Sequence, residues 1–162
     1  MEGKRKSFIK RIIPLIGIFI GLLTFFAWMI STYLFITGST FTRTILIILL
    51  VYQYTFAKKS DLYLDFVRFL NPFGYFDHVE LILEEPLKES KSIFSHHPHG
   101  ILAYGFSMSS AFNKTLYNAF HCGSRGMLNL PISGIFSRWM GLYGVNKNSF
   151  QELMKKGILF LT

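Results

Sequence analysis

The sequence predicts an α/β protein in two parts, a membrane-embedded helical hairpin followed by an α/β domain. Two observations support this prediction. The first is a long uncharged apolar stretch near the N-terminus that is flanked by basic residues. The second is the alternation of short apolar runs with helical patterns farther along the chain, which is typical of an α/β sheet. The expected boundary divides the chain into residues 1–59 and residues 60–162.

The distribution of charge supports this division and argues against a nucleic-acid partner. The chain has 17 Lys and Arg against 9 Asp and Glu, a formal net charge of +8. Residues 1–59 hold +7 of this excess, and residues 60–162 hold only +1. A nucleic-acid-binding domain would spread its positive charge over a folded face, whereas here the charge flanks apolar segments. The apolar content of 51% excludes disorder, and the single cysteine excludes a small scaffold held by disulfides.

Two apolar segments make up the predicted hairpin. Residues 12–37 are almost wholly apolar, and as a helix they extend roughly 39 Å, enough to cross a hydrocarbon core of about 30 Å with tilt. Residues 44–57 extend only about 21 Å, so a second span is marginal even if it starts at Phe41 with Arg43 snorkelling to the interface. We therefore expect a hairpin or re-entrant pair that turns within Thr37–Thr42.

Two further features of the hairpin bear on its packing and orientation. Gly17 and Gly21 form a G-x-x-x-G pair, which either lets the two helices approach closely or reflects the glycine content of membrane helices. Basic residues precede the first segment and follow the second at Lys58 and Lys59, so both ends should face the cytosol. The main alternative, a cleaved signal peptide, has an apolar region of only about 7–15 residues.

The second part begins with a predicted helix over residues 60–70. Ser60 is a suitable N-cap, and Leu62, Phe66, Val67 and Leu70 fall on one helical face. This face either lies along the bilayer surface or packs on the core of the domain. The dipeptide at residues 71–72, Asn-Pro, should end the helix.

Strands and helices then alternate. We expect strands at residues 92–95, 127–130, 142–145 and 158–161, and helices at residues 101–112 and 131–140. Ser149 and Glu152 match a capping box for a further helix that stops at Gly157. The last strand is still apolar where the chain ends at Thr162, and few helices are present to cover a parallel sheet. We therefore expect the sequence to be a fragment or a short form of a longer protein.

Side chains that could act in catalysis are concentrated in His96-His97-Pro98-His99-Gly100. This stretch lies where a strand should be followed by a helix. On an extended backbone His97 and His99 project to the same side. Pro98 restricts the backbone of this pair, and Gly100 allows a sharp turn or a close approach. A neutral imidazole with a pKa of about 6.5 is a suitable general base. The first amides of the following helix suit a developing oxyanion.

Three other roles compete with general-base catalysis. The histidines could bind a metal, although His121 and Cys122 are the nearest further ligands and no third or fourth ligand has a sensible spacing. Cys122 could be a nucleophile, but nothing around it indicates a lowered pKa. The histidines could also serve only as buried structural groups, a role less suited to three of them around a proline and before a glycine.

The stretch His97-Pro98-His99-Gly100, downstream of a basic N-terminus and an apolar hairpin, resembles the diacylglycerol acyltransferase type 2 family. That family includes monoacylglycerol acyltransferases and wax synthases. Tyr75-Phe76-Asp77 is similar to the family's Tyr-Phe-Pro motif, with Asp77 in place of the proline. Pro131, Gly141 and Val145 keep a spacing similar to the family's Pro, Gly and Val. The resemblance extends over nearly the whole chain, while the family continues beyond this endpoint.

The resemblance implies transfer of an acyl group from acyl-CoA to the hydroxyl of a diacylglycerol or a related lipid alcohol, such as a long-chain alcohol. It implies the catalytic pair His97 and His99, and substrate-binding roles for Tyr75, Phe76, Pro98 and Gly100. The expected partners are membrane lipid, acyl-CoA as a co-substrate and the acceptor lipid, with no other cofactor and no metal; formation of a homo-oligomer is left open. The expected location is the endoplasmic reticulum membrane or a lipid droplet.

A second reading belongs to a different functional class. In it the chain is a catalytically inactive, truncated membrane hairpin that targets lipid droplets or associates with a full-length enzyme. The early end of the chain supports this reading. In both readings the glycosylation sequon at Asn113 faces the cytosol and stays unmodified.

Overall fold

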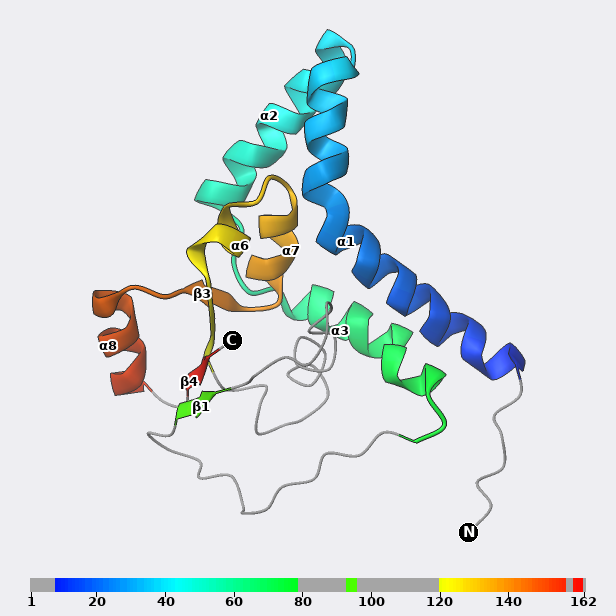
Figure 1. The fold of residues 1–162 in the computed structure, drawn as a ribbon, viewed down its shortest axis with the longest axis vertical. Coiled ribbons are helices and arrows are strands. Elements are labelled where there is room, and N and C mark those ends of the chain that lie inside the picture. Colours follow the sequence, from blue (N-terminus) through cyan, green and yellow to red (C-terminus); the bar gives the residue numbers. More distant parts are fainter. Residues whose placement is uncertain (1–7, 79–92, 96–119, 157–158, 162) are drawn as a thin grey trace.

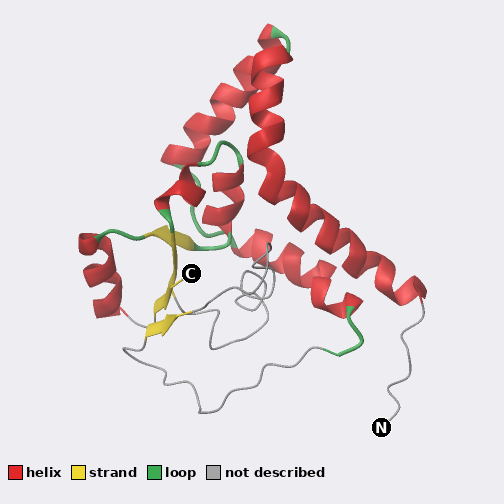
Figure 2. Cartoon of the chain, viewed as in Figure 1, coloured by secondary structure: helices red, strands yellow, loops and turns green. Residues whose placement is uncertain are grey.

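The computed structural model describes residues 8–78, 93–95, 120–156 and 159–161 (Figure 1). A helical hairpin projects from one end, and a small parallel sheet lies toward the other end with helices beside it (Figures 1 and 2). Two short helices, α6 (Arg125–Asn129) and α7 (Ser133–Trp139), lie between the hairpin and the sheet. The predicted mixed α/β class is confirmed, whereas embedding of the hairpin in a membrane stays a prediction.

The hairpin consists of α1 (Ile12–Thr37), which follows a 3-10 turn η1 (Phe8–Arg11), and α2 (Thr40–Thr55). The turn lies within the expected range, but α2 begins four residues earlier than the apolar run predicts. It starts there because the Ser39 hydroxyl accepts a hydrogen bond from the backbone N–H of Thr42 at 3.3 Å, as an N-cap does.

Arg43 has a different role from the expected snorkelling side chain. Its guanidinium donates to the backbone carbonyls of Phe35 and Ile36, at 3.0 Å each. These carbonyls belong to the last turn of α1, where a helix leaves its carbonyls without intrahelical partners. A cation also interacts favourably with the negative end of the helix dipole. The single charge between the two apolar segments therefore caps α1.

Helix α1 changes direction near its middle (Figure 1). Near the middle of α1 the Ser133 hydroxyl accepts a hydrogen bond from the backbone N–H of Trp28 at 3.0 Å and donates one to the carbonyl of Phe25 at 3.1 Å. A side chain that inserts into the backbone ladder of a helix is an established cause of bending. The first half of α1 then lies beside α3, and its second half pairs with α2.

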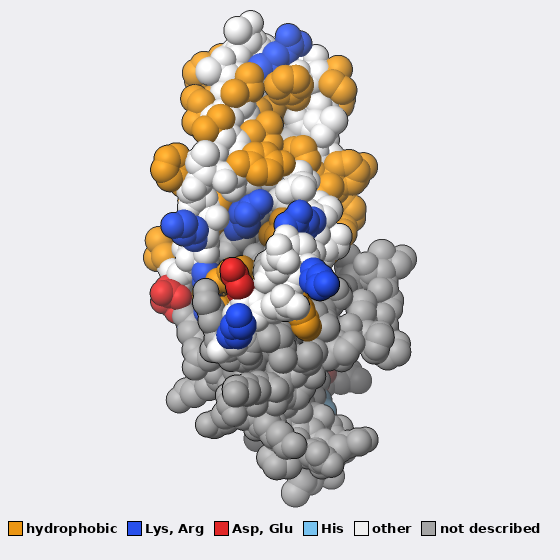
Figure 3. Space-filling view, turned by 90° about the vertical axis from the view of Figure 1, so that its left-hand side faces the viewer, with side chains coloured by type: hydrophobic (Ala, Val, Ile, Leu, Met, Phe, Trp, Pro, Cys, Tyr) orange, Lys and Arg blue, Asp and Glu red, His pale blue; other side chains and the backbone are white. Residues whose placement is uncertain are grey.

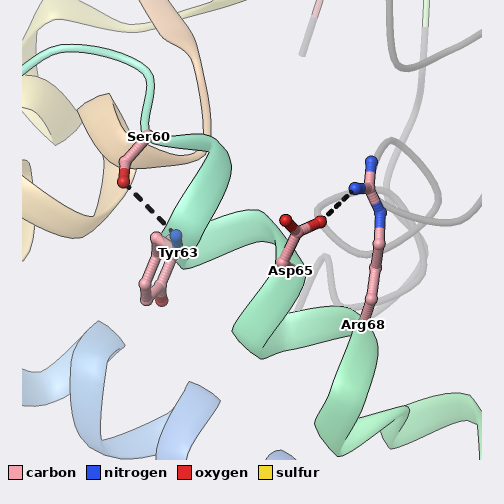
Figure 4. A network of polar contacts seen from close by, with 4 residues as sticks. All are labelled: Ser60, Tyr63, Asp65 and Arg68. Carbon is pink, nitrogen blue, oxygen red and sulfur yellow. Dashed lines mark hydrogen bonds and ion pairs between the residues drawn. The ribbon is translucent and has the colours of Figure 1, made fainter.

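Helix α3 (Asp61–Leu70) is confirmed together with its cap (Figure 4). The Ser60 hydroxyl accepts from the backbone N–H of Tyr63 at 3.3 Å, and the helix ends at Asn71 in the left-handed region, with φ 41°. An ion pair of 2.7 Å joins Arg68 to Asp65 on the exposed side.

The apolar face predicted for α3, expected on either the bilayer surface or the domain core, is divided between exposed and buried positions. The residues that are buried are spaced three apart, namely Leu64, Val67 and Leu70. Leu62 and Phe66 were expected on the same face, but they are 83% and 43% exposed. The reason is the position of the core, because Tyr63, Phe73 and Met140 pack against Leu64 and Val67 and so fix the rotation of the helix.

Gly17 permits contact with α3 rather than with α2. A Cβ added at Gly17 would lie 3.0 Å from the Leu70 Cβ and 3.6 Å from the Pro72 Cβ. The first glycine of the G-x-x-x-G pair therefore allows a close approach between α1 and the end of α3.

The sheet has four parallel strands, β1 (Ile93–Ser95), β2 (Phe120–Gly123), β3 (Leu142–Gly144) and β4 (Leu159–Leu161). Their order is β1-β4-β2-β3, so the last strand along the chain lies between the first two. Strands at three of the predicted positions are confirmed, and β3 ends one residue earlier than expected.

The predicted strand at residues 127–130 is wrong. This segment lies mostly in α6, whose N-cap Ser124 accepts from the backbone N–H of Gly126 at 3.1 Å. The strand that pairs with β3 is β2, a few residues earlier and not expected from the sequence. A run of four residues with three apolar side chains cannot distinguish a strand from part of a buried helix by its pattern alone.

Two helices start at other positions than expected. The helix predicted from Pro131 begins at Ser133, because Pro131 and Ile132 form a turn. Helix α8 (Lys147–Lys156) begins two residues before Ser149, with Asn146 accepting the first backbone hydrogen bond from Phe150. Ser149 is therefore not its N-cap, and the predicted stop at Gly157 lies outside the described residues.

Four aromatic rings join the hairpin to the domain. The cluster consists of Tyr52 of α2, Tyr63 of α3, and Phe136 and Trp139 of α7. The centroids of the rings that touch lie 5.4–6.4 Å apart. The Trp139 indole donates to the Tyr52 hydroxyl at 3.2 Å. Burial in this cluster raises the pKa of the Tyr63 hydroxyl above its ordinary value. A hydrogen bond with Thr24 lowers the pKa, but its effect is smaller than that of burial. The cluster fixes the base of α2 to α3 and α7.

Candidate functional site

The carboxyl ends of all four strands lie at one edge of the sheet, because every pairing is parallel. Ligands of open α/β sheets bind outside this edge. Strand β1 ends at Ser95, and the His96-His97-Pro98-His99-Gly100 motif follows directly in sequence. The strand predicted to lead into the motif is therefore confirmed.

The motif itself lies outside the described residues. This includes the predicted catalytic residues His97 and His99 and the predicted substrate-binding residues Pro98 and Gly100. The expected helix at residues 101–112 and the sequon at Asn113 also lie outside them. The roles of these residues stay predictions.

The structure describes Tyr75 and Phe76, and it places them at the foot of α1. Tyr75 ends the 3-10 turn η2 (Pro72–Tyr75), which packs against the start of α1. The two rings meet edge to face, with centroids 5.5 Å apart. Phe76 is 48% exposed, so it can contact a lipid or another ligand.

A basic residue of η1 holds this aromatic pair in position. The guanidinium carbon of Arg11 lies 6.0 Å from the centroid of the Tyr75 ring, a cation–π distance. Arg11 also donates to the Asp77 carboxylate at 2.5 Å. Asp77 is thus the ion-pair partner of a residue that precedes α1. The charge of Arg11 is therefore balanced by Asp77, and this ion pair lies beside the Tyr75 ring.

Cys122 is poorly suited to nucleophilic chemistry. Its side chain is only 1% exposed and packs with Leu153 of α8. Burial raises the pKa of the thiol, whereas a nucleophilic cysteine needs a lowered one. The thiol donates a weak hydrogen bond to the carbonyl of Phe120, at 3.8 Å. The structure therefore gives Cys122 a packing role in β2.

The described residues offer no metal site. Within these ranges, no group of three or more His, Cys, Asp or Glu side chains is close enough to hold a metal ion. His121 lies next to Cys122 in β2 and is buried at 5% exposure. Successive side chains of a strand point to opposite faces, so these two neighbours cannot converge on one ion in an extended strand.

The hairpin is the described part best suited to a membrane. Among the described helices, α1 alone is long and apolar enough to cross a bilayer, a test that a signal sequence near the N-terminus also passes. Of its most apolar window, only 11% is buried, whereas a core helix of a soluble protein is mostly buried. Figure 3 shows apolar side chains over the upper hairpin, with Lys and Arg side chains gathered below them. This pattern matches a helix end anchored at a membrane interface.

One polar residue of the hairpin was missed by the sequence analysis. Gln53 of α2 is 0% exposed, and its amide nitrogen donates to the carbonyls of Leu128 and Leu130 at 3.1 and 3.2 Å. It fastens α2 to the segment between α6 and α7. The available signal was a lone amide side chain among the apolar and aromatic residues 45–54, since a buried amide needs hydrogen-bond partners.

Comparison with known proteins gives one informative similarity. The chain is 34% identical over 92 residues to diacylglycerol O-acyltransferase 2A of Umbelopsis ramanniana. The match covers 52% of this chain and 26% of that protein, so the chain spans about a quarter of the length of this relative. No protein-family model matches the chain, and no solved structure does.

Proposed function

We propose that this protein is a membrane-associated O-acyltransferase. It moves a fatty acyl group from acyl-CoA to the hydroxyl of a diacylglycerol or a related lipid alcohol. The single observation that carries the reaction class is the similarity to diacylglycerol O-acyltransferase 2A. The apolar, outward-facing hairpin supports lipid substrates, because the acceptor partitions into a bilayer and the donor carries an apolar acyl chain.

The position of β1 supports a catalytic role for the histidine motif. Ser95 ends β1 at the carboxyl edge of the sheet, and the motif begins with the next residue. In this proposal His97 and His99 act on the acceptor hydroxyl, and Pro98 and Gly100 shape the backbone that holds them. Phe76, exposed at the foot of α1, contacts the lipid, and Tyr75 is oriented by Arg11.

The proposed reaction is a single acyl transfer. One imidazole removes the proton of the acceptor hydroxyl while the oxygen attacks the thioester carbonyl carbon. Backbone amides after the motif stabilise the negative charge on the carbonyl oxygen. The carbon–sulfur bond then breaks, and the coenzyme A thiolate takes the proton from the imidazolium. The ester and free coenzyme A are the products, and the histidine returns to its neutral form.

The hairpin places this chemistry at a membrane surface. We propose the endoplasmic reticulum membrane, or the surface of a lipid droplet, with both chain ends in the cytosol. Lys58 and Lys59, both exposed, follow α2 directly and suit the cytosolic side.

An acyltransferase assay tests this function. Microsomes from a host without its own diacylglycerol acyltransferases should carry the chain and receive labelled oleoyl-CoA and dioleoylglycerol. His97→Ala and His99→Ala should each lower the formation of triacylglycerol by at least about 100-fold, the usual contribution of a general base. His78→Ala is the matched control, because His78 is exposed and lies outside the motif.

Two results would contradict the proposal. Full activity in both motif variants would remove the histidines from the mechanism. No activity in the unchanged chain, despite normal membrane insertion, would support the second reading, an inactive hairpin that targets lipid droplets or associates with a full-length enzyme.

A further inference from the structure

A half-open cavity of about 190 Å³ lies within the hairpin. It is bounded on two sides by α1 and α2 and closed at its base by the turn that precedes α7. Its main lining residues are Ser31, Phe35, Leu46, Leu50, Pro131 and Ile132. The cavity therefore brings together three segments that are far apart in the sequence.

The lining of this cavity is hydrocarbon in character. Its two hydroxyl groups both hydrogen-bond within their own helix, because Ser31 and Thr32 donate to the carbonyl of Trp28 at 3.0 and 2.7 Å. The other lining side chains are apolar. A water molecule needs two to four polar partners, and purely apolar cavities stay dry. The lining thus offers nothing to a polar ligand and disfavours water.

The base of the cavity is held in place by polar contacts behind it. Ser133 bonds to the backbone of α1 at Phe25 and Trp28, and Gln53 bonds to the carbonyl of Leu130. Between these anchors Ile132 has a φ of 62° and a ψ of −46°, a region that β-branched residues rarely adopt. Backbone strain of this kind persists only where the surrounding structure imposes it, and it is concentrated at ligand sites.

We propose that this cavity binds part of a fatty acyl chain of a lipid. Its exposed rim consists of Phe35 and Ile36, which are 44% and 68% exposed and continue the apolar surface of the hairpin. A void that remained empty would lose van der Waals contacts along its walls, and a flexible hydrocarbon chain can restore them. The chain enters from the outer face of the hairpin, between the second half of α1 and α2.

Either a bilayer lipid or an acyl-CoA could supply this chain, and the two differ in the hydrophobic free energy that they gain on binding. A chain that already lies in a bilayer gains no hydrophobic free energy on entering, because lipid tails are as apolar as leucine. The chain of an acyl-CoA that arrives from water does gain it. The inference rests on the proposed function only for the identity of the lipid, since the hydrocarbon character of the cavity is independent of acyl transfer.

Photo-crosslinking of the full chain in nanodiscs tests this proposal. The first probe is palmitoyl-CoA with a diazirine near the end of its acyl chain, and the second is phosphatidylcholine with the same modified chain. Peptide mapping should find acyl-CoA crosslinks at Phe35, Leu46 and Leu50, and excess unlabelled palmitoyl-CoA should remove them. Crosslinks from phosphatidylcholine that the same competitor removes would identify a bilayer lipid as a second occupant of the same site.

Cavity-filling variants give the decisive comparison. Leu50→Trp should reduce the crosslinks that unlabelled palmitoyl-CoA removes at least about tenfold. A side chain that is too large for an apolar pocket weakens binding by about this factor or more. Ile36→Trp at the exposed rim fills the mouth without disturbing the buried core and should reduce them as well. Ile48→Trp is the matched control on the same helix, since Ile48 is 61% exposed and does not line the cavity.

The outcomes separate this inference from the proposed function. Crosslinks that are spread evenly over exposed helix residues, resist competition and are equal in all variants would overturn the cavity as a chain-binding site. Saturable crosslinks in a chain that lacks acyltransferase activity would support the cavity and contradict the catalytic proposal. His97→Ala should abolish activity and leave the competed crosslinks unchanged.

Discussion

The hydroxyl of Ser133, at the start of α7, accepts a hydrogen bond from the backbone N–H of Trp28 in the middle of α1, at 3.0 Å. The same hydroxyl donates to the carbonyl of Phe25 at 3.1 Å. These two bonds join residues more than one hundred positions apart, and they lie near the middle of α1. Ser133 therefore links the hairpin to the helices that lead into the sheet.

Ser133→Ala should lower the free energy of unfolding by about 1–3 kcal/mol, because it removes two part-buried hydrogen bonds that each contribute roughly 0.5–1.5 kcal/mol. Denaturant unfolding of the chain in detergent, followed by circular dichroism, measures this change. Ser137→Ala is the matched control, since Ser137 bonds only within α7 and its loss should change the free energy by less than about 0.5 kcal/mol. Equal stability of the two variants would show that the contact with α1 contributes nothing.

Gly134→Ala should destabilise the fold, although alanine is the better helix former by about 1 kcal/mol. A Cβ at Gly134 would lie 2.2 Å from the carbonyl oxygen of Leu128 and 2.5 Å from the Gln53 amide nitrogen. Such overpacking lowers the free energy of unfolding by about 1–3 kcal/mol. The same unfolding experiment measures it, with Gly126→Ala as the control because only the Ser124 hydroxyl is near. A stabilised Gly134→Ala variant would contradict this packing.

The sequence was informative where local signals act alone. Ser60 caps a helix that ends near Asn71, and the short apolar run after residue 92 forms β1, so the histidine motif could be placed after a strand. Long-range contacts were not predictable. Nothing in the local pattern indicates that Ser133 reaches α1 or that Gln53 reaches Leu128, because these pairs are set by packing between distant segments. The rotation of α3 follows from its core neighbours for the same reason.

The Asn113 sequon gives a test of topology. In the proposed orientation this residue faces the cytosol, so a chain expressed in mammalian cells should show no mobility shift on treatment with endoglycosidase H. An N-terminal tag that carries a known acceptor sequon should also stay unmodified, since both ends are expected in the cytosol. A shift that disappears in Thr115→Ala would place the region after the histidine motif in the lumen and overturn this orientation.

Cys122 should react slowly with thiol reagents in the folded protein. Burial raises the pKa of its thiol, so at a given pH less reactive thiolate is present than in an exposed cysteine. Alkylation by iodoacetamide at pH 8, measured by mass spectrometry, should be slow in the native chain and fast in dodecyl sulfate. Because the folded state disfavours the thiolate, stability should be fully present below the ordinary thiol pKa of about 8.5 and fall as the pH rises above it.

A cysteine at position 62 in a Cys122→Ala background is the positive control, because Leu62 is 83% exposed. Native labelling of Cys122 at the rate of this control would contradict its burial in β2 and reopen a role in chemistry.

The exposed apolar stripe of α3 should contact the bilayer surface. Leu62, Phe66 and Phe69 are 83%, 43% and 71% exposed and follow helical spacing, and a helix with such a face lies in the membrane interface. A fluorophore attached through Phe69→Cys, in the Cys122→Ala background and in proteoliposomes, should be quenched by nitroxide lipids and protected from aqueous iodide. Asp61→Cys on the charged flank of the same helix should show the opposite response. Equal access of iodide to both positions would place the stripe away from the membrane and leave the hairpin as the membrane contact of the described residues.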